Sequence, residues 1–147
     1  MKILRTEQSI PMDLFLLADP SEAQILGYIH NAIVYIAKIA DEIIGGYILV
    51  IIGHDRYELK NIAVNVGHQK KGVGTKLLNH MIETVKELKG ESVEVGTGTF
   101  GYQLSFYQRA GFRVDRIDKD FFLLNYGEAI FEDGIQHKDM LRLLLKL

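Results

Sequence analysis

The segment from Gly67 to Leu78, GHQKKGVGTKLL, places three glycines and two adjacent lysines directly before an amphipathic helix. Glycines let successive backbone N–H groups turn toward one oxyanion, and the positive end of the helix dipole favours negative charge there. The pattern has the form Q-x-x-G-x-G at Gln69, Gly72 and Gly74. It predicts an anion site that uses backbone donors and suits a pyrophosphate held without a metal. A tight turn with a solvated lysine pair is the alternative.

Two other phosphate-binding motifs come close to matching. The P-loop pattern G-x-x-x-x-G-K-[ST] fits Gly67 and Gly72, but Val73 stands where that motif needs its lysine. The segment GTGTFG at 96–101 has the full G-x-G-x-x-G spacing of a dinucleotide site and follows a predicted strand. Too few residues follow it to complete a doubly wound fold. The sequence therefore favours the Gln69–Gly74 loop, and a nucleotide-binding module that uses GTGTFG stays open as an alternative.

Length, composition and charge limit the class of protein. The chain has 147 residues, which suits one domain with a sizeable core, and 48% of them are hydrophobic. The net charge of -2 argues against a dedicated nucleic-acid-binding protein, and the absence of cysteine excludes disulfides and thiolate chemistry. The apolar run Ile43–Ile52 is too short to span a membrane. We expect a single soluble domain, residues 1–147, in the cytoplasm.

Hydrophobic periodicity and capping residues predict alternating strands and helices. Strands are expected at 2–7, in two runs within 32–52 that are separated at Asp41-Glu42, and at 57–64, 92–95, 112–118 and 139–147. Helices are expected after Ser9 and after Ser21, each of which can act as an N-cap, over 73–88 with Gly90 ending the helix, and over 101–110. This order predicts an α/β fold, a mixed sheet with helices on its faces.

Two segments of the chain resemble a known family. NIAVNVGHQKKGVGTKLL, residues 61–78, is similar to the acetyl-CoA signature of the GNAT N-acetyltransferase superfamily. SFYQRAGFR, residues 105–113, is similar to the (L/F)Y-x-x-x-GF segment found later in that family. The ending of the chain resembles a subgroup of small bacterial GNAT enzymes. The resemblance implies a GNAT fold with a central mixed, largely antiparallel and splayed sheet of about six or seven strands, helices on both faces, and acetyl-CoA wedged into the sheet.

The resemblance also implies which residues bind the cofactor. The loop before the helix would hold the pyrophosphate of coenzyme A, and the backbone of the preceding strand would hold the pantetheine arm and the thioester carbonyl. The implied residues are Ile62, Ala63, Val64, Gln69, Lys70, Lys71, Gly72, Val73, Gly74, Thr75 and Thr99. Thr99 stands where many relatives carry an asparagine, so that contact departs from the family pattern.

Acetyl transfer from a thioester to an amine needs a neutral amine, a stabilised carbonyl oxygen and a proton for the leaving thiolate. Because the chain has no cysteine, we expect direct attack in a ternary complex. The resemblance implies Glu58 as the base and Tyr107 as the acid. Alternation along the strand places Glu58 on one face with Lys60, Ile62 and Val64. A surface ion pair with Lys60 is the alternative role of Glu58, and packing on the sheet is the alternative role of Tyr107.

We therefore expect an acetyl-CoA-dependent N-acetyltransferase that acetylates the primary amine of a small molecule, with a peptide amine as the second choice. A non-catalytic acyl-CoA-binding sensor would keep the Gln69–Gly74 loop but would need neither Glu58 nor Tyr107. No metal is expected, because the histidines show no metal-ligand spacing and suit scattered surface positions. The expected partners are acetyl-CoA and the amine, without nucleic acid or membrane, and a homodimer stays open.

Overall fold

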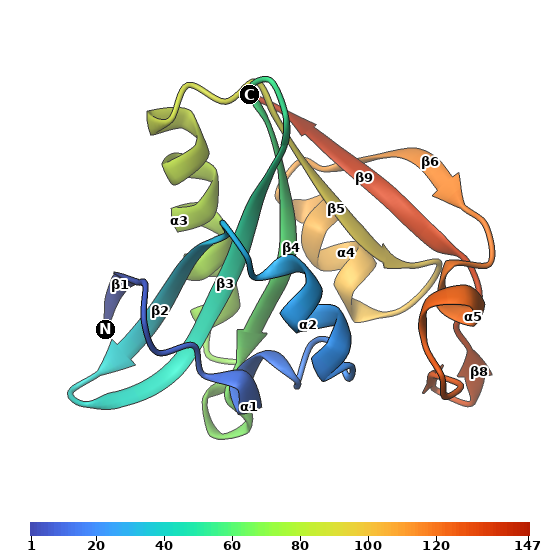
Figure 1. Cartoon of the computed structure of the whole chain (residues 1–147), viewed down its shortest axis with the longest axis horizontal. Helices are drawn as coiled ribbons and strands as arrows, with labels where there is room; N and C mark the ends of the chain where they lie inside the picture. Colours follow the sequence, from blue (N-terminus) through green and yellow to red (C-terminus); the bar gives the residue numbers. More distant parts are fainter. The chain divides into compact units, whose positions relative to one another are not determined.

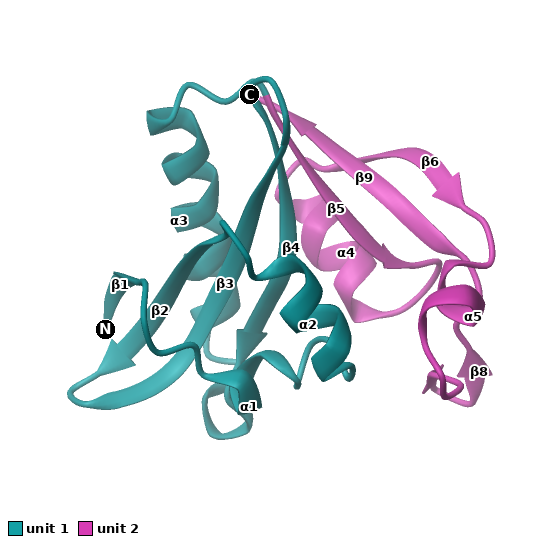
Figure 2. Cartoon of the chain, in the orientation of Figure 1, with its two compact units in different colours: residues 1–91 teal, residues 92–147 magenta.

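The computed structural model describes all 147 residues, and they form two compact units, residues 1–91 and residues 92–147 (Figure 2). Unit 1 contains β1 (Lys2–Thr6), α1 (Met12–Phe15), α2 (Glu22–Tyr28), β2 (Ile33–Ile39), β3 (Glu42–Gly53), β4 (Arg56–Val64), the 3-10 helix η1 (Val66–His68) and α3 (Val73–Glu87). Unit 2 contains β5 (Ser92–Gly98), α4 (Tyr102–Arg109), β6 (Arg113–Asp118), α5 (Phe121–Asn125), β7 (Phe131–Glu132), β8 (Ile135–Gln136) and β9 (Met140–Lys146) (Figure 1). That residues 1–147 act as one domain stays a prediction.

Unit 1 is built on an antiparallel sheet with helices on both of its faces. The strand order is β1-β2-β3-β4. Helix α3 lies on one face, and α1 and α2 lie on the other (Figure 1). The sequence predicts an apolar stripe at Val73, Leu77, Leu78, Met81, Ile82, Val85 and Leu88. In the structure it is buried at Val73, Leu77, Leu78, Met81 and Val85, whereas Ile82 is half-buried and Leu88, beyond the end of α3, is exposed. Burial of this stripe holds the helix against the sheet, and each fully buried aliphatic side chain contributes roughly 1.5–3 kcal/mol.

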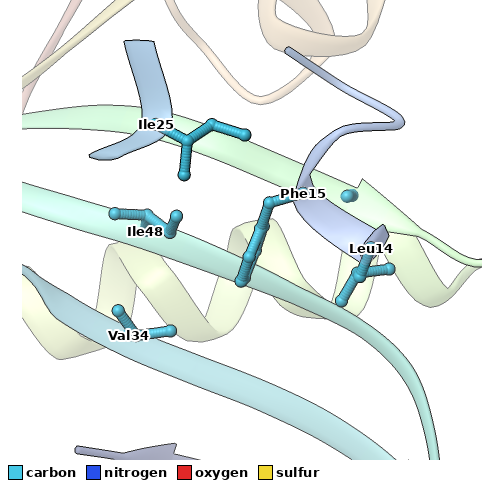
Figure 3. Close-up of a cluster of buried hydrophobic side chains, with 6 residues drawn as sticks. Leu14, Phe15, Ile25, Val34 and Ile48 are labelled. Carbon is cyan, nitrogen blue, oxygen red and sulfur yellow. The ribbon is translucent and has the colours of Figure 1, made fainter. Parts of the chain in front are cut away.

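Phe15 and Ile25 anchor the two short helices α1 and α2. Both side chains are fully buried. They belong to one cluster with Leu14, Val34, Ile48 and Ala63 (Figure 3). Gly46 allows this close approach, because a Cβ there would lie 3.1 Å from the Phe15 ring and 2.7 Å from the backbone oxygen of Tyr35. Since α1 has only four residues, side-chain packing and not helix propensity keeps it formed.

The ends of three helices test the predicted caps. Ser21 caps α2 as predicted, since its Oγ accepts a hydrogen bond from the backbone N–H of Gln24 at 3.2 Å. The predicted cap at Ser9 is wrong, because α1 begins at Met12 and has no side-chain cap. At the end of α3 the left-handed residue is Lys89, with φ of 60°, and not Gly90. Glycine is needed at 90 for space, because a Cβ there would overlap the side chains of α3 and β4.

Unit 2 has an antiparallel sheet in the order β5-β9-β6 and the small hairpin β7-β8. The chain's last segment, predicted as a covered strand, is β9, and it pairs on both of its edges. Helix α5 and the hairpin were not predicted, because a five-residue helix and two-residue strands carry no readable periodicity. The strands and helices of the two units confirm the predicted α/β class with largely antiparallel pairing. None of the helices has the length and apolar character to cross a bilayer.

A polar cluster links α3 to β3 inside unit 1. The hydroxyl of the fully buried Tyr47 lies 2.9 Å from Nδ1 of His80 and 3.2 Å from Oγ1 of Thr84. The Thr84 hydroxyl donates to the backbone oxygen of His80 at 2.8 Å. Burial lowers the pKa of His80 below its ordinary value of 6.5, and the nearby charge of Glu87 opposes this shift. The imidazole therefore stays neutral in the fold at pH values where it would be protonated in the unfolded chain.

We predict that His80 makes unit 1 less stable as the pH falls below about 6.5. In that range the unfolded chain binds a proton that the folded chain does not, so the free energy of unfolding decreases with falling pH. The variant His80→Asn cannot titrate, and it should flatten the change in Tm between about pH 7.5 and about pH 5. The control His30→Asn removes an exposed histidine outside this cluster and should keep the wild-type slope. Equal slopes for His80→Asn and wild type would contradict the prediction.

Candidate functional site

Strand β4 contains a β-bulge at Lys60, and this irregularity determines which way Glu58 points. The residues on either side of the bulge, Leu59 and Asn61, stand opposite consecutive residues of β3, so Lys60 has no partner on that strand. An extra residue shifts the alternation of side chains between the two faces by one position. Even-numbered residues before the bulge therefore lie on the face that odd-numbered residues occupy after it.

Glu58 consequently lies on the face of the sheet that is covered by α1 and α2. It stands opposite Val50, which shares its face with Ile48 of the buried cluster. Its Oε2 lies 3.2 Å from Nζ of Lys60, and that Nζ lies 5.7 Å from the centre of the Tyr28 ring on α2. The predicted shared face of Glu58 and Lys60 is confirmed.

Ile62 and Val64, in contrast, lie on the face covered by α3. Ile62 stands opposite Tyr47, which contacts His80 on α3. Val64 stands opposite Gly45, where a Cβ would be 3.0 Å from Leu77 of α3. The prediction that they share a face with Glu58 is wrong, because strict alternation does not allow for a bulge.

Glu58 is a nearly buried carboxylate that pairs with a more exposed ammonium. The side chain of Glu58 is 9% exposed and that of Lys60 is 30% exposed. The ion pair that the sequence offered as an alternative role is thus present. Burying a carboxylate costs free energy, and the pair with Lys60 offsets part of that cost.

A hydrogen-bonded network that the sequence did not predict lies beside this pair. Nδ2 of Asn61 donates to the Tyr28 hydroxyl at 3.1 Å and to the backbone oxygen of Phe15 at 3.0 Å. The Tyr28 hydroxyl donates to Oδ2 of Asp19 at 3.0 Å, and Oδ1 of Asp19 accepts from the backbone N–H of Ser21 at 3.2 Å. The network ties the α1–α2 connection to β4. The only part of this network that the local sequence indicates is the turn at Asp19-Pro20-Ser21.

The predicted anion loop joins the end of β4 to α3. After η1, Nε2 of Gln69 donates to the backbone oxygen of Val64 at 3.0 Å, so this side chain holds the loop on the strand. Lys70 and Gly72 adopt positive φ values of 61° and 82°. Gly72 is the N-cap of α3, and a Cβ there would meet open space. Glycine is therefore needed at 72 for its backbone conformation and not for packing.

The first turn of α3 has the properties of an anion-binding helix end. No side chain caps it, and it contains no acidic residue. The first N–H groups of a helix have no partner within the helix, so those of Val73, Gly74 and Thr75 are left for a ligand. Lys70 and Lys71 are exposed beside them. Backbone donors, a helix dipole and two cations together suit a pyrophosphate.

The remaining predicted residues lie in three other environments. Ala63 is 5% exposed and its side chain belongs to the buried cluster, so any contact with a ligand has to come from its backbone. Thr99 is exposed directly after β5 in unit 2. Tyr107, on α4, is 4% exposed, and its ring centre lies 5.7 Å from that of Phe112. Burial raises the pKa of the Tyr107 hydroxyl well above its ordinary value of 10.0, so this phenol keeps its proton at any working pH.

The glycines of GTGTFG make room for side chains of unit 2 itself. A Cβ at Gly98 would overlap the ring of His137, and one at Gly101 would overlap the carboxylate of Glu132. These two side chains pair at 3.0 Å, and His137 also stacks on Phe100 with ring centres 4.3 Å apart. The Glu132 carboxylate would repel a phosphate, which argues against a nucleotide at this loop. The surface position expected for His137 is wrong, since it is 7% exposed.

Comparison with known proteins gives consistent matches. The family model described as "Acetyltransferase (GNAT) domain" matches residues 30–114. An uncharacterised N-acetyltransferase of Bacillus subtilis (strain 168), YvbK, is 46% identical over 136 residues, which are 92% of this chain and 88% of that protein.

Two solved structures extend the similarity to almost the whole chain. The structure described as an IAA acetyltransferase from Bacillus cereus ATCC 14579 is 44% identical, with a TM-score of 0.95 and 99% of both chains covered. A GNAT family acetyltransferase from Elizabethkingia anophelis, with acetyl-CoA bound, is 40% identical, with a TM-score of 0.96 and coverage of 99% of this chain and 97% of that one. On the family model and on these relatives, this chain belongs to the GNAT family of acetyltransferases.

Proposed function

We propose that the chain transfers the acetyl group of acetyl-CoA to the primary amine of a small molecule, by direct attack in a ternary complex. The family defines the activity as acetyl transfer and the donor as acetyl-CoA, which the related Elizabethkingia protein binds. The observation that carries the proposal is the uncapped, glycine-opened start of α3 beside two exposed lysines. In this proposal residues 1–147 act as one domain, which the matches over 99% of the chain support. We also propose that the enzyme works in the cytoplasm.

The pyrophosphate of coenzyme A is proposed to bind at the N–H groups of residues 72–75. The positive φ at Gly72 turns the chain into α3 and leaves these donors uncovered. Lys70 and Lys71 add charge attraction, and the backbone of Ile62–Val64 holds the pantetheine arm and the thioester carbonyl.

Glu58 is proposed as the base that removes the proton from the attacking amine, directly or through a water. A sensor that only binds acyl-CoA would have no use for a nearly buried carboxylate, whose burial costs free energy. The network of Asp19, Tyr28 and Asn61 keeps the strand around Glu58 in place. Once neutral, the amine nitrogen forms its bond to the acetyl carbon, and the C–S bond breaks.

Tyr107 is proposed to face the sulfur that leaves. Its raised pKa keeps the hydroxyl protonated, and a protonated phenol can donate to the thiolate as negative charge develops there. The contact with Phe112 fixes the ring, so the position of the hydroxyl is set by packing.

The first prediction for this function concerns the loop. Gly72→Val should weaken acetyl-CoA binding by roughly tenfold or more, because a β-branched residue resists positive φ and its side chain would cover the N–H donors. The measurement is the Kd for acetyl-CoA by isothermal titration calorimetry. Gly27→Ala is the control, since a Cβ at Gly27 also meets open space and its φ is not positive. An unchanged Kd for Gly72→Val would place the anion site elsewhere.

A second prediction separates chemistry from packing at α4. Tyr107→Phe keeps the ring that contacts Phe112 but removes the hydroxyl, so the Kd for acetyl-CoA should hold while kcat falls by on the order of 10²-fold. The control is Tyr102→Phe, which removes a hydroxyl from a 72% exposed tyrosine of the same helix. Turnover of Tyr107→Phe equal to that of wild type would reduce Tyr107 to a packing role.

The third prediction tests the base. Glu58→Gln should lower kcat/KM by on the order of 10²–10⁴-fold near neutral pH. The loss should shrink at high pH, where more of the amine is already neutral, so the two pH profiles should converge. Release of coenzyme A, followed by a thiol reagent, measures the rate, and Tm confirms that the variant folds. Profiles of the same shape and height would leave Glu58 as an ion-pair partner only.

A further inference from the structure

Lys60 occupies the solvent side of the carboxylate that is proposed as the base. Its ammonium lies 3.2 Å from Glu58, and its side chain is 30% exposed where that of Glu58 is 9% exposed. Their contact shows that both side chains lie on the same face of β4. The Tyr28 ring, 5.7 Å from Nζ, borders the ammonium on the α2 side. A protonated amine that approaches Glu58 therefore also comes close to the positive charge of Lys60.

This neighbour affects different amines in different ways. Most alkylamines arrive protonated, and a plain alkylammonium would compete with Lys60 for Glu58 and be repelled by it. A diamine adds a further positive charge. An amine with its own carboxylate differs. That carboxylate can pair with the ammonium of Lys60 in place of Glu58, and Glu58 can then accept the amine proton.

The other carboxylate of this network is already engaged. Asp19 accepts hydrogen bonds from the Tyr28 hydroxyl and from the backbone N–H of Ser21, so both of its oxygens already have donors. Lysine is suited to the exchange of partners, because its ammonium is a compact charge on a flexible stem with rotatable donors.

We propose that Lys60 binds a carboxylate of the acceptor, so that the enzyme prefers amines that carry a carboxylate over plain amines and diamines. This inference rests on the proposed function, with Glu58 as the base. In the reaction the amine proton passes to Glu58 and the new N–C bond forms as the C–S bond breaks. The thiolate leaves with a proton from the Tyr107 hydroxyl, which regains a proton from solvent as Glu58 releases its own. Lys60 positions the acceptor and keeps its own protons.

The test compares acceptors of equal carbon-chain length with saturating acetyl-CoA. Each set contains an ω-amino acid, the corresponding alkylamine and the corresponding diamine, and sets of increasing chain length cover different spacings between amine and carboxylate. The measurement is kcat/KM for each acceptor, from release of coenzyme A. Wild type should favour the amino acid in at least one set.

Substitutions at Lys60 make the comparison specific. Lys60→Gln should reduce the preference for the amino acid by roughly tenfold, mainly through a higher KM for that acceptor, and should improve use of the diamine. Lys60→Arg should retain the preference, because it keeps the charge. Lys60→Met, which keeps an apolar stem beside Tyr28, repeats the neutral substitution if the Gln variant is unstable. Lys86→Gln is the control, because Lys86 is an exposed lysine of α3 paired with Glu83, and it should behave as wild type.

The outcomes separate this inference from the function on which it rests. If wild type acetylates amines but no amino acid is preferred, or if both neutral variants keep the preference, the role of Lys60 is overturned while the acetyltransferase proposal stands. If wild type binds acetyl-CoA but acetylates no amine of any set, the proposed function fails and the inference fails with it.

Discussion

One extra residue in β4 determines which groups of unit 1 can meet. With uninterrupted alternation, Glu58 would share the face of Ile62 and point under α3, where the sheet is packed with apolar side chains. The bulge at Lys60 instead turns Glu58 toward α2 and leaves Ile62 on the α3 side. The same strand therefore carries the ion pair of Glu58 and Lys60 on the face that also holds the buried cluster with Ala63. Bulges commonly redirect side chains next to functional sites, and this one has that geometry.

The loop before α3 depends on the same sheet for its shape. Its start is held at Asn65, whose backbone N–H donates to Ile44 at 2.8 Å and whose Nδ2 donates to Ile43 at 3.1 Å. Its end is fixed by the burial of Val73 and Leu77 at the start of α3. With both ends fixed, the N–H groups of the first turn are ordered before any ligand arrives. Such preorganisation lowers the entropic cost of binding an anion.

Glycines serve two different physical purposes in this chain, and the pattern of letters does not distinguish them. Gly72 is required for its positive φ and has open space around it, as expected where a backbone must approach a ligand. Gly98 has no positive φ and is required because the ring of His137 fills the space of its side chain. The dinucleotide-like spacing of GTGTFG thus reflects internal packing in unit 2, whereas the spacing around Gly72 reflects an open helix start.

The sequence by itself determined the features that depend on neighbouring residues. The apolar stripe of α3, the cap at Ser21 and the glycine-rich start of α3 are local patterns, and the structure contains all three. The order of the longer strands and helices could be read for the same reason, and two motif segments, residues 61–78 and 105–113, carried the resemblance to the GNAT family. Tertiary structure alone decided the face of Glu58, the burial of His137 and the network from Asp19 to Asn61. Each of these depends on which distant segment lies opposite a residue, and a bulge or a ring that fills a glycine's space leaves no periodic trace in the chain.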